Sequence, residues 1–570
     1  MVELSPEQIS ICDDHGPLSV MACAGSGKTR TTVRRLADMR INQVGSRARL
    51  ALLSFSNAAV DTFREDYQRL LEEHPAAAAM PLVEIDTVDS FITSLVLRPH
   101  AHRTMQSPRC AFLVTGTEPF LGGFNFYDGA RNQPVKLLTH AREGGLDRFR
   151  FRNGYAMTDV ATAEAIKAVN RLGKTGAYTH DLGRYWAYRT LVETPELTQA
   201  LSRRYPFILI DEAQDVVSTQ EAIFDLLIQA GSQLSMIGDA NQAIFEFVGA
   251  TGEFLARYGK RAGVTSRGLT VNFRSVPRIV AVANALTARN DTWARAAPAE
   301  LNGAFFAGYA QNEPAKLIET FRNMIATAGL KDSDAAVVCR SASLVKRFGG
   351  ADEAVGQGVV RSLVEATIAR DQLGKHPEAF KIVLRCIVAL LADAHGDVTS
   401  KITRGGAEVA GLRRTIWSFV RDTENGLPHG ALLADTEWHP KLVKNVKALL
   451  ADLKSRYGLE PCDTIGQRLK KAALPHAGLF QTPDLAAPDV VALRTETVHQ
   501  VKGESIDAVL YVASKPHTAE MLAGVATEDG RIGYVALTRA RNLFLLGLPI
   551  NSLAELRPAL LARGFLEAGA

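Results

Sequence analysis

The sequence has few cysteines, a small net charge and no long apolar run. Six cysteines are spread over 570 residues, and no two of them have the spacing typical of zinc or iron–sulfur ligands. Scattered, unpaired cysteines are typical of a reducing compartment, so we expect a cytoplasmic protein. No apolar run approaches the ~20 residues of a bilayer-spanning helix, and the N-terminus lacks the features of a signal peptide. We therefore expect no association with a membrane.

The net charge excludes little by itself. A formal charge of +4 is small for this length and does not alone indicate nucleic acid binding. Hydrophobic residues make up 46% of the chain and charged residues 22%, as in ordinary soluble globular proteins. Because 570 residues exceed what one hydrophobic core can organise, we expect several domains.

Short apolar runs that end in polar residues recur along the chain. They occupy residues 18–21, 50–55, 207–210, 234–237, 335–339, 508–512 and 543–546. Such runs are typical of buried parallel strands. The pattern predicts an α/β fold with two parallel sheets, whose functional residues follow the carboxyl ends of the strands.

Two long segments interrupt this series of strands. Residues 95–191 are rich in arginine, glycine and aromatics, and residues 344–487 include a stretch with apolar positions at helical spacing, 380–391. We expect both to be mainly helical insertions. The predicted division of the chain is 1–94, 95–191, 192–275, 276–343, 344–487 and 488–570.

A glycine-rich loop follows the first predicted strand. Gly25, Ser26 and Gly27 would let backbone N–H groups close on phosphates, while Lys28 would reach the β- and γ-phosphates. The Thr29 hydroxyl would bind Mg²⁺. A glycine turn that binds no phosphate is the alternative, and Lys-Thr in register argues against it. ATP and Mg²⁺ are therefore the expected cofactors.

Acidic and amide side chains follow two later strands. Asp211 would hold Mg²⁺, and Glu212 would be the base that orients the attacking water. An acidic helix cap is the alternative for this pair, and the glycine-rich loop in the same chain favours catalysis. Gln242 follows the next strand and is a candidate sensor of the γ-phosphate, with a simple turn residue as the alternative.

Two arginines far from the loop in sequence complete this set. Arg274 and Arg539 lie near predicted strand ends, where they would stabilise the charge on the transferring phosphoryl group. Solvated arginines are the alternative. Gln8 offers a side-chain amide for adenine. Arginines so distant from the loop predict that closure of a cleft is part of the mechanism.

In their order along the chain, these segments resemble the motifs of the UvrD/Rep/PcrA-type superfamily 1A DNA helicases. The matching segments are Gln8, 25–30, 53–59, 86–91, 208–215, 237–247, 272–275, 497–504 and 534–540. The resemblance implies two RecA-like P-loop domains, 1A and 2A, each interrupted by an insertion, 1B and 2B.

The resemblance also implies further contacts. The implied ATP contacts are Gln8, Gly25, Ser26, Gly27, Lys28, Thr29, Arg30, Phe273 on adenine and Glu504 at the ribose. The implied DNA contacts are Phe55, Asn57, Phe91, Phe245, Phe247 and His499. Stacking of a base on an aromatic ring contributes ~1–3 kcal/mol without sequence preference. Core burial is the alternative for Phe55, Phe245 and Phe247.

Three positions depart from the family pattern. Asp89 replaces a usual histidine, Val248 replaces a usual arginine, and the acid Glu504 comes one position early. Two polar contacts of the family are therefore missing, whereas the catalytic carboxylates and arginines are retained. These departures bear on the coupling between ATP and DNA.

The expected function is an ATP- and Mg²⁺-dependent motor on single-stranded or tailed duplex DNA, moving 3′ to 5′, in DNA repair or anti-phage defence. Residues 86–100 look like the helicase components of Gabija-type anti-phage systems, which implies a partner nuclease of the OLD family. The chain ends about thirty residues after the last motif, so we expect no appended nuclease domain. A DNA-sensing ATPase subunit that recruits a nuclease and unwinds little is the alternative. A scaffold with a vestigial loop is disfavoured by the complete hydrolytic set.

Overall fold

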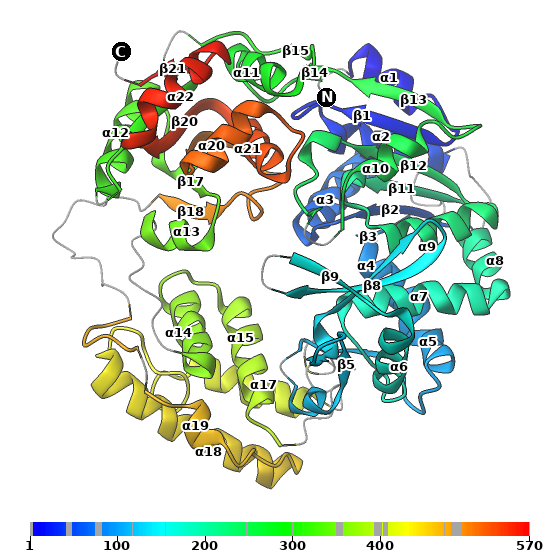
Figure 1. Ribbon diagram of the computed structural model, residues 1–570, viewed down its shortest axis with the longest axis vertical. Helices are drawn as coiled ribbons and strands as arrows, with labels where there is room; N and C mark the ends of the chain where they lie inside the picture. The colour runs from blue at the N-terminus through cyan, green and yellow to red at the C-terminus, as the bar shows by residue number, and fades with distance from the viewer. Residues whose placement is uncertain are drawn as a thin grey trace. The chain divides into compact units, whose positions relative to one another are not determined.

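The computed structural model describes residues 4–41, 48–73, 83–116, 118–153, 156–246, 249–298, 301–311, 313–348, 357–392, 402, 409–471, 473–479 and 493–568. The chain forms two compact units (Figure 1). The first unit comprises Met1–Ile92, Leu191–Gly350 and Val490–Ala570, and the second comprises Thr93–Thr190 and Ala351–Asp489. No helix in the described part of the chain is long and apolar enough to cross a membrane.

The first unit contains two parallel sheets. The first sheet has the strand order β13-β1-β12-β11-β2-β3. Its strands are β1 (Leu18–Ala22), β2 (Leu50–Ser54), β3 (Val83–Thr87), β11 (Phe207–Asp211), β12 (Gln233–Gly238) and β13 (Thr265–Leu269). The helices associated with it are α1 (Pro6–Cys12), α2 (Lys28–Ile41), α3 (Asn57–Glu73), α4 (Val88–Ile92), α8 (Pro195–Arg204), α9 (Ser218–Gln229) and α10 (Glu253–Tyr258).

The second sheet has the order β18-β17-β19-β20-β16-β21. Its strands are β16 (Gly303–Tyr309), β17 (Ala335–Cys339), β18 (Arg494–Thr497), β19 (Ile506–Val512), β20 (Ala540–Pro549) and β21 (Leu566–Glu567). Its helices are α11 (Pro277–Thr287), α12 (Pro314–Thr327), α13 (Ala342–Phe348), α20 (Lys515–Ala523), α21 (Glu528–Arg539) and α22 (Ile550–Ala562). A short parallel ribbon, β14 (Val271–Asn272) and β15 (Thr292–Trp293), precedes this sheet in sequence.

The second sheet is covered on both faces. Phe544 and Leu546 of β20 belong to one hydrophobic cluster, and Leu543 and Leu545 belong to another. This alternation follows from the two-residue period of a strand. A strand buried on both faces can be apolar at every position, which is why the apolar runs identified it.

The seven predicted strands are all present, which confirms the α/β class with parallel sheets. The apolar-run pattern misses β16, an internal strand of the second sheet, and it misses strands at the sheet edges, because these are polar and partly exposed. The sequence of β18 is Arg-Thr-Glu-Thr, and β13 is largely exposed. The predicted four-domain division stays a prediction.

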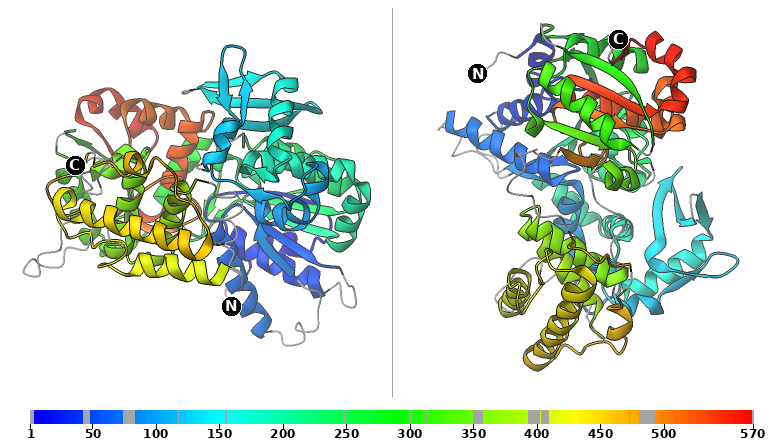
Figure 2. Two further views of the ribbon diagram at one scale, coloured as in Figure 1. Left: turned by 90° about the horizontal axis from the view of Figure 1, so that it is seen from below. Right: turned by 90° about the vertical axis from the view of Figure 1, so that its left-hand side faces the viewer.

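The first insertion is mixed rather than mainly helical, which differs from our expectation. It contains an antiparallel sheet of β7 (Leu138–Glu143), β8 (Leu146–Asn153) and β9 (Ala156–Val160) (Figure 2). Smaller pairs are β4 (Phe112–Leu113) with β10 (Ala177–Tyr178) and β5 (Asn125–Tyr127) with β6 (Asn132–Pro134), and the helices are α5 (Arg98–Thr104), α6 (Thr162–Gly173) and α7 (His180–Glu193). In β8, Phe149 and Phe151 are buried while Arg148 and Arg152 are exposed. This two-residue alternation is a strand signal that arginine content alone conceals.

The second insertion is helical, as expected. Its helices are α14 (Gly358–Asp371), α15 (His376–Ala389), α17 (Ala410–Arg421), α18 (His439–Tyr457) and α19 (Ile465–Arg468). They enclose one hydrophobic cluster that includes the fully buried Trp438. Phe380 of α15 stacks on Trp417 of α17, with ring centroids 4.4 Å apart.

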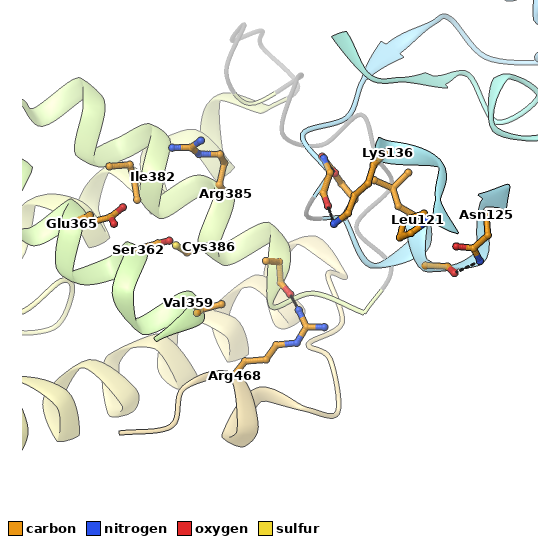
Figure 3. A pocket seen from close by; sticks show the side chains of 16 residues that line it. Leu121, Asn125, Lys136, Val359, Ser362, Glu365, Ile382, Arg385, Cys386 and Arg468 are labelled. Carbon is orange, nitrogen blue, oxygen red and sulfur yellow. Dashed lines mark hydrogen bonds between the residues drawn. The ribbon is translucent and has the colours of Figure 1, made fainter. Parts of the chain in front are cut away.

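A cavity of about 710 Å³ lies in the second unit, lined by residues of both insertions (Figure 3). Two of its basic side chains already donate to backbone carbonyls within their own insertion. Lys136 donates to Gly116 (2.8 Å), and Arg468 donates to Ala389 (2.6 Å). The phosphate loop and the catalytic candidates belong to the first unit, so this cavity is not the candidate site.

Candidate nucleotide and DNA site

The phosphate loop joins β1 to α2 and requires glycine at two positions. Gly25 has φ +70° and Gly27 has φ +77°, a region that favours glycine. A Cβ on Gly25 would lie 2.5 Å from the Cβ of Arg274, and a Cβ on Gly27 would lie 2.7 Å from Nε2 of Gln8. At Gly25, space as well as backbone conformation therefore excludes larger residues, whereas at Gly27 the backbone conformation excludes them and the Gln8 amide would also have to move.

The Gln8 side chain binds the backbone of the phosphate loop. Its Oε1 accepts from the Ser5 N–H (3.0 Å), while the Ser5 hydroxyl accepts from the Gln8 N–H (3.3 Å), which forms a capping box on α1. Its Nε2 donates to the Ser26 carbonyl (3.0 Å), and the residue is only 3% exposed. The adenine contact of Gln8 stays a prediction, because both ends of the amide are engaged within the protein.

Lys28, Asp211 and Glu212 meet at the carboxyl ends of β1 and β11. Lys28 Nζ lies 3.2 Å from each carboxylate oxygen of Glu212. Glu212 has φ +53°, an uncommon conformation for a residue with a side chain. Such backbone strain is found at functional sites, where the surrounding structure enforces it.

Two buried polar atoms in this group lack a hydrogen-bond partner within the described residues. They are Oδ1 of Asp211 and Oγ of Ser26. An unsatisfied buried polar atom is unfavourable by about 1–3 kcal/mol, so a ligand is expected to satisfy it. The Asp211 carboxylate and the Thr29 hydroxyl are oxygen donors, which Mg²⁺ prefers. The residues present therefore fit a Mg²⁺–nucleotide complex.

The two carboxyl groups differ in their pKa values. Burial, together with the neighbouring Glu212, raises the pKa of Asp211 to about 7. Burial would also raise the pKa of Glu212, but the charges of Lys28 and Lys502 outweigh it and lower this pKa to about 2. Glu212 is therefore ionised at neutral pH and can accept a hydrogen bond from water.

A continuous chain of hydrogen bonds runs from the first sheet to α21. Gln214 Nε2 donates to Glu212 (2.5 Å), and Gln214 Oε1 accepts from the backbone N–H of Asp239 (3.0 Å). The Asp239 carboxylate accepts from Gln242 Nε2 (2.8 Å), whose Oε1 accepts from Arg539 (2.9 Å). The predicted residues Glu212, Gln242 and Arg539 are thus brought together.

The intermediate members Gln214 and Asp239 were not among the predicted site residues. Both are nearly inaccessible, with exposed fractions of 0%. Their signal in the sequence is position: Gln214 follows the acidic pair by two residues, and Asp239 follows the glycine that ends β12. A Cβ on Gly238 would lie 2.4 Å from Oε1 of Gln214, so the glycine leaves room for this chain of bonds.

The two predicted arginines are neighbours. Arg274 follows β14, and the Asn272 side chain accepts from the backbone N–H groups of Arg274 and Ser275 (2.8 Å each). Arg274 donates to the Thr538 carbonyl (3.0 Å), one residue before Arg539. Burial and the charge of Arg539 lower the pKa of Arg274 to about 9. Two partly or fully buried cations side by side favour an anionic ligand.

The candidate nucleoside contacts differ in how they are held. Phe273 is 40% exposed, and its backbone N–H donates to the Gly25 carbonyl (2.8 Å). Glu504 binds Arg494 (2.6 Å), while its backbone carbonyl accepts from Arg539 (3.4 Å). Arg30 is exposed in the first turn of α2. The proposed adenine, ribose and Arg30 contacts stay predictions.

The candidate DNA contacts of the first domain differ in exposure. Phe55 is half-buried and Asn57 is exposed, where β2 ends and α3 begins. Phe91 is only 4% exposed, and its ring packs edge-on against Tyr205 with centroids 5.0 Å apart. That packing favours a core role for Phe91. Asp89, at the departure from the family pattern, accepts from Gln220 (2.8 Å).

Phe245 and His499 come together although they are far apart in sequence. Their ring centroids lie 5.6 Å apart, and Phe245 is half-buried. His499 Nε2 lies 3.1 Å from the Ile244 carbonyl. Phe247 and Val248 lie outside the described residues. The DNA roles of Phe245, Phe247 and His499 stay predictions.

A buried ion pair was not found from the sequence. Lys502 binds both carboxylate oxygens of Asp215, at 2.7 and 2.6 Å, and their side chains are only 8% and 4% exposed. Burial raises the pKa of Asp215 to about 6, although Lys502 opposes this rise. Lys502 Nζ also lies 4.7 Å from the ring centroid of Phe245, within cation–π range. The partners are 287 residues apart, so no local pattern links them.

Sequence comparison shows what the residues of this site are similar to. A profile described as the UvrD/REP helicase N-terminal domain matches residues 4–140 and 161–262. Over these residues the chain is similar to this family. The match includes the phosphate loop, the acidic pair and Gln242, and the predicted resemblance to superfamily 1A helicases is confirmed.

Individual relatives of the family are similar over different lengths. UvrD1 of Mycobacterium leprae is 23% identical over 390 residues, which cover 60% of this chain and 47% of UvrD1. UvrD2 of Mycobacterium tuberculosis is 22% identical over 571 residues, covering 92% of this chain and 75% of UvrD2. Rep of Escherichia coli is 24% identical over 306 residues, covering 48% of this chain and 42% of Rep. The chain thus spans less than half the length of UvrD1 and Rep. All three are named ATP-dependent DNA helicases.

Proposed function

We propose that the protein is an ATP-dependent motor that moves along single-stranded DNA and unwinds tailed duplexes. The observation that carries this proposal is the buried chain of hydrogen bonds from Glu212 to Arg539. It links a candidate hydrolytic base on one core domain to a candidate arginine finger on the other. The names of the relatives support DNA as the substrate.

ATP would be held by the phosphate loop, with Lys28 at the β- and γ-phosphates. Thr29 and Asp211 would hold Mg²⁺, and bound Mg²⁺ would neutralise charge on the phosphates. Phe273 would stack on adenine, and Glu504 would contact the ribose once it leaves Arg494.

Hydrolysis would proceed by attack of a water oxygen on the γ-phosphorus, with cleavage of the bond to the β–γ bridging oxygen. Glu212 would orient this water and accept its proton. Arg274 and Arg539 would stabilise the charge that develops on the phosphoryl oxygens. The products are ADP and inorganic phosphate.

DNA would be held as a single strand by base stacking. Phe55, Phe245 and Phe247 would stack on successive bases, and Asn57 and His499 would add polar contacts. Closure and opening of the two core domains in each ATP cycle would move the strand. The direction 3′ to 5′ is proposed from the resemblance to superfamily 1A helicases.

Two substitutions test the hydrolytic site. We expect Glu212→Gln and Lys28→Ala each to lower DNA-stimulated phosphate release by about 10²- to 10⁴-fold, because each removes a group needed in the transition state. Circular dichroism is expected to show an unchanged fold. Glu253→Gln is the matched control, since Glu253 is an exposed carboxylate of the same core domain. Turnover at the level of the unsubstituted protein in Glu212→Gln would contradict the assignment.

We place the motor in DNA repair, as the family suggests. A second candidate role, beside an OLD-family nuclease in anti-phage defence, rests on the resemblance of residues 86–100 to Gabija-type helicases. In that role the chain would sense DNA and regulate the nuclease with little unwinding of its own. A strand-displacement assay on a 3′-tailed duplex separates the roles: efficient unwinding by the isolated chain argues for the motor.

A further inference from the structure

The segment Asp239–Glu246 leaves the first sheet and enters the hydrophobic core around the second sheet, β16–β21. The second sheet and its helices, all in the first unit, are called the second domain here. It follows β12, which ends at Gly238 in the middle of the first sheet. Ile244 is fully buried, and it belongs to the hydrophobic cluster that also contains Val535 of α21 and Phe544 of β20. Phe245 packs against the same cluster. The segment is continuous with one domain and packed into the other.

Helix α21 holds this segment with three side chains, from Arg531 to Arg539. The contacts are Tyr534 to the Asp239 carboxylate (3.3 Å), Arg539 to the Gln242 amide (2.9 Å), and Arg531 Nε to the Ala243 carbonyl (2.6 Å). A helix rises 1.5 Å per residue, so Arg531 and Arg539 lie about 12 Å apart along one rigid rod. Any movement of α21 therefore acts on both ends of the segment.

Arg531 also makes a salt bridge with Glu246, the residue after Phe245. Its side chain is 11% exposed, and its Nη1 donates to the carbonyls of Val525 and Ala526 (3.2 Å each). Its Nη2 binds the Glu246 carboxylate, which is half exposed. The planar fork of an arginine bound on several sides has little freedom to swing. Glu246 is thus held by a side chain that is itself fixed.

The neighbours of Phe245 come from the second domain as well. His499 packs against its ring, and Lys502 Nζ lies 4.7 Å from its centroid. Phe245 therefore lies in the chain between two anchored residues, Ile244 and Glu246, and its ring is close to two residues that precede β19.

We propose that Arg531 and Glu246 are positioning residues that join Phe245 to α21, so that Phe245 and Arg539 move as one body with the second domain. The proposal rests on the proposed function, in which Arg539 serves ATP and Phe245 stacks on DNA. The mechanical link then transmits the state of the nucleotide to the base-stacking ring through one helix and one ion pair.

The first test compares hydrolysis with and without DNA. We expect Glu246→Gln in the full chain to lower kcat at saturating oligo-dT about tenfold, within the usual range of coupling between two sites, and to leave the DNA-free rate within about twofold. Glu246→Asp, which keeps the charge, should restore part of the stimulation. Glu555→Gln is the matched control, because it breaks the exposed Lys515–Glu555 pair of the same domain.

An unchanged kcat with DNA in Glu246→Gln would overturn the positioning role. A reduced rate of hydrolysis that returns to normal at saturating DNA would also overturn it, because Glu246 would then affect only the affinity for DNA. Fluorescence anisotropy of labelled oligo-dT supplies the Kd that separates these cases.

The second test does not depend on catalysis, so it distinguishes failure of this inference from failure of the proposed function. Hydrogen exchange should be faster in Glu246→Gln at residues 243–246 and unchanged in β12. Equal exchange in both proteins at 243–246 would overturn the anchoring. An unsubstituted protein whose hydrolysis does not respond to DNA would refute the proposed function, while the exchange result still decides whether α21 holds the segment.

Discussion

The two core domains of the first unit are both built on parallel sheets, but the side chains that they bring to their interface have opposite charges. The first domain contributes carboxylates at the interface: Glu212, Asp215, Asp239 and Glu246. The second domain and the segment leading into it contribute cations: Arg274, Lys502, Arg531 and Arg539. Lys28 is the cation that the first domain supplies for itself.

This difference shows how the chemistry is divided. The first domain has the candidate phosphate loop and the candidate base, but the cations that would stabilise phosphoryl transfer come from elsewhere. The second domain has arginines without a phosphate loop. Because neither half holds all the candidate residues, the proposed hydrolysis would require the two to be together, which is the property expected of a motor.

Substitution of Arg539 tests this division of the site most directly, and we expect it to have the largest effect on ATP hydrolysis. Arg539→Ala should lower the rate of ATP hydrolysis by about 10³- to 10⁵-fold, as for an arginine finger. Steady-state kinetics with DNA measures the change. Arg557→Ala, at an exposed arginine that pairs with Glu567, is the control. A loss below tenfold would mean that Arg539 serves packing and not the phosphoryl group.

The Asp215–Lys502 pair tests whether charge also holds the domains together. Lys502→Met should destabilise the protein by about 3–5 kcal/mol, because it leaves Asp215 buried without its partner. Thermal unfolding of the single variant and of the Lys502→Met/Asp215→Asn double variant measures the coupling. The double variant should recover most of the loss.

Lys515→Met is the control for this pair, since Lys515 and Glu555 form an exposed ion pair of the same domain. Exposed pairs contribute at most about 1 kcal/mol. If Lys502→Met and Lys515→Met have the same Tm, the buried pair does not stabilise the interface.

The smallest expected effect is a change in how stability depends on pH, and it involves His499. Burial lowers the pKa of His499 below its usual range, although the Ile244 carbonyl opposes this. Since the unfolded chain takes up this proton first, the contribution of His499 to stability is complete above the unfolded pKa of about 6.5 and is lost as pH falls toward the lower, folded pKa. His499→Gln should flatten the dependence of Tm on pH between about 5 and 7. An identical pH profile in the variant would contradict this.

Features encoded locally could be predicted from the sequence. Most central strands of both sheets are apolar at successive positions because both faces are buried, although β16 was not among the predicted runs, and Lys28 and Thr29 follow the loop glycines directly. The alternation of apolar and charged residues around Phe149 and Phe151 was also a local signal of a strand. The many arginines there obscured it, and the insertion was expected to be mainly helical.

Contacts between distant segments could not be predicted. Nothing near Asp215 indicates that its partner is Lys502, and Gln8 in the first helix gives no sign that its amide holds Ser26. Gln214 and Asp239 belong to recognisable motifs, but their place between Glu212 and Gln242 follows from the packing of β11 beside β12. Partner identity depends on the tertiary fold, which residue type and spacing do not specify.

Gly25 has a consequence that extends beyond phosphate binding. Its bare α-carbon faces the β-carbon of Arg274 across a gap that a methyl group would overfill. The loop therefore packs directly against the segment that carries Arg274. The missing side chain at Gly25 allows that segment to approach this closely. Substitution at position 25 is then limited from two sides, by the nucleotide that the loop is proposed to bind and by the segment that carries Arg274, and a substitution at either Gly25 or Arg274 changes the constraints on the other.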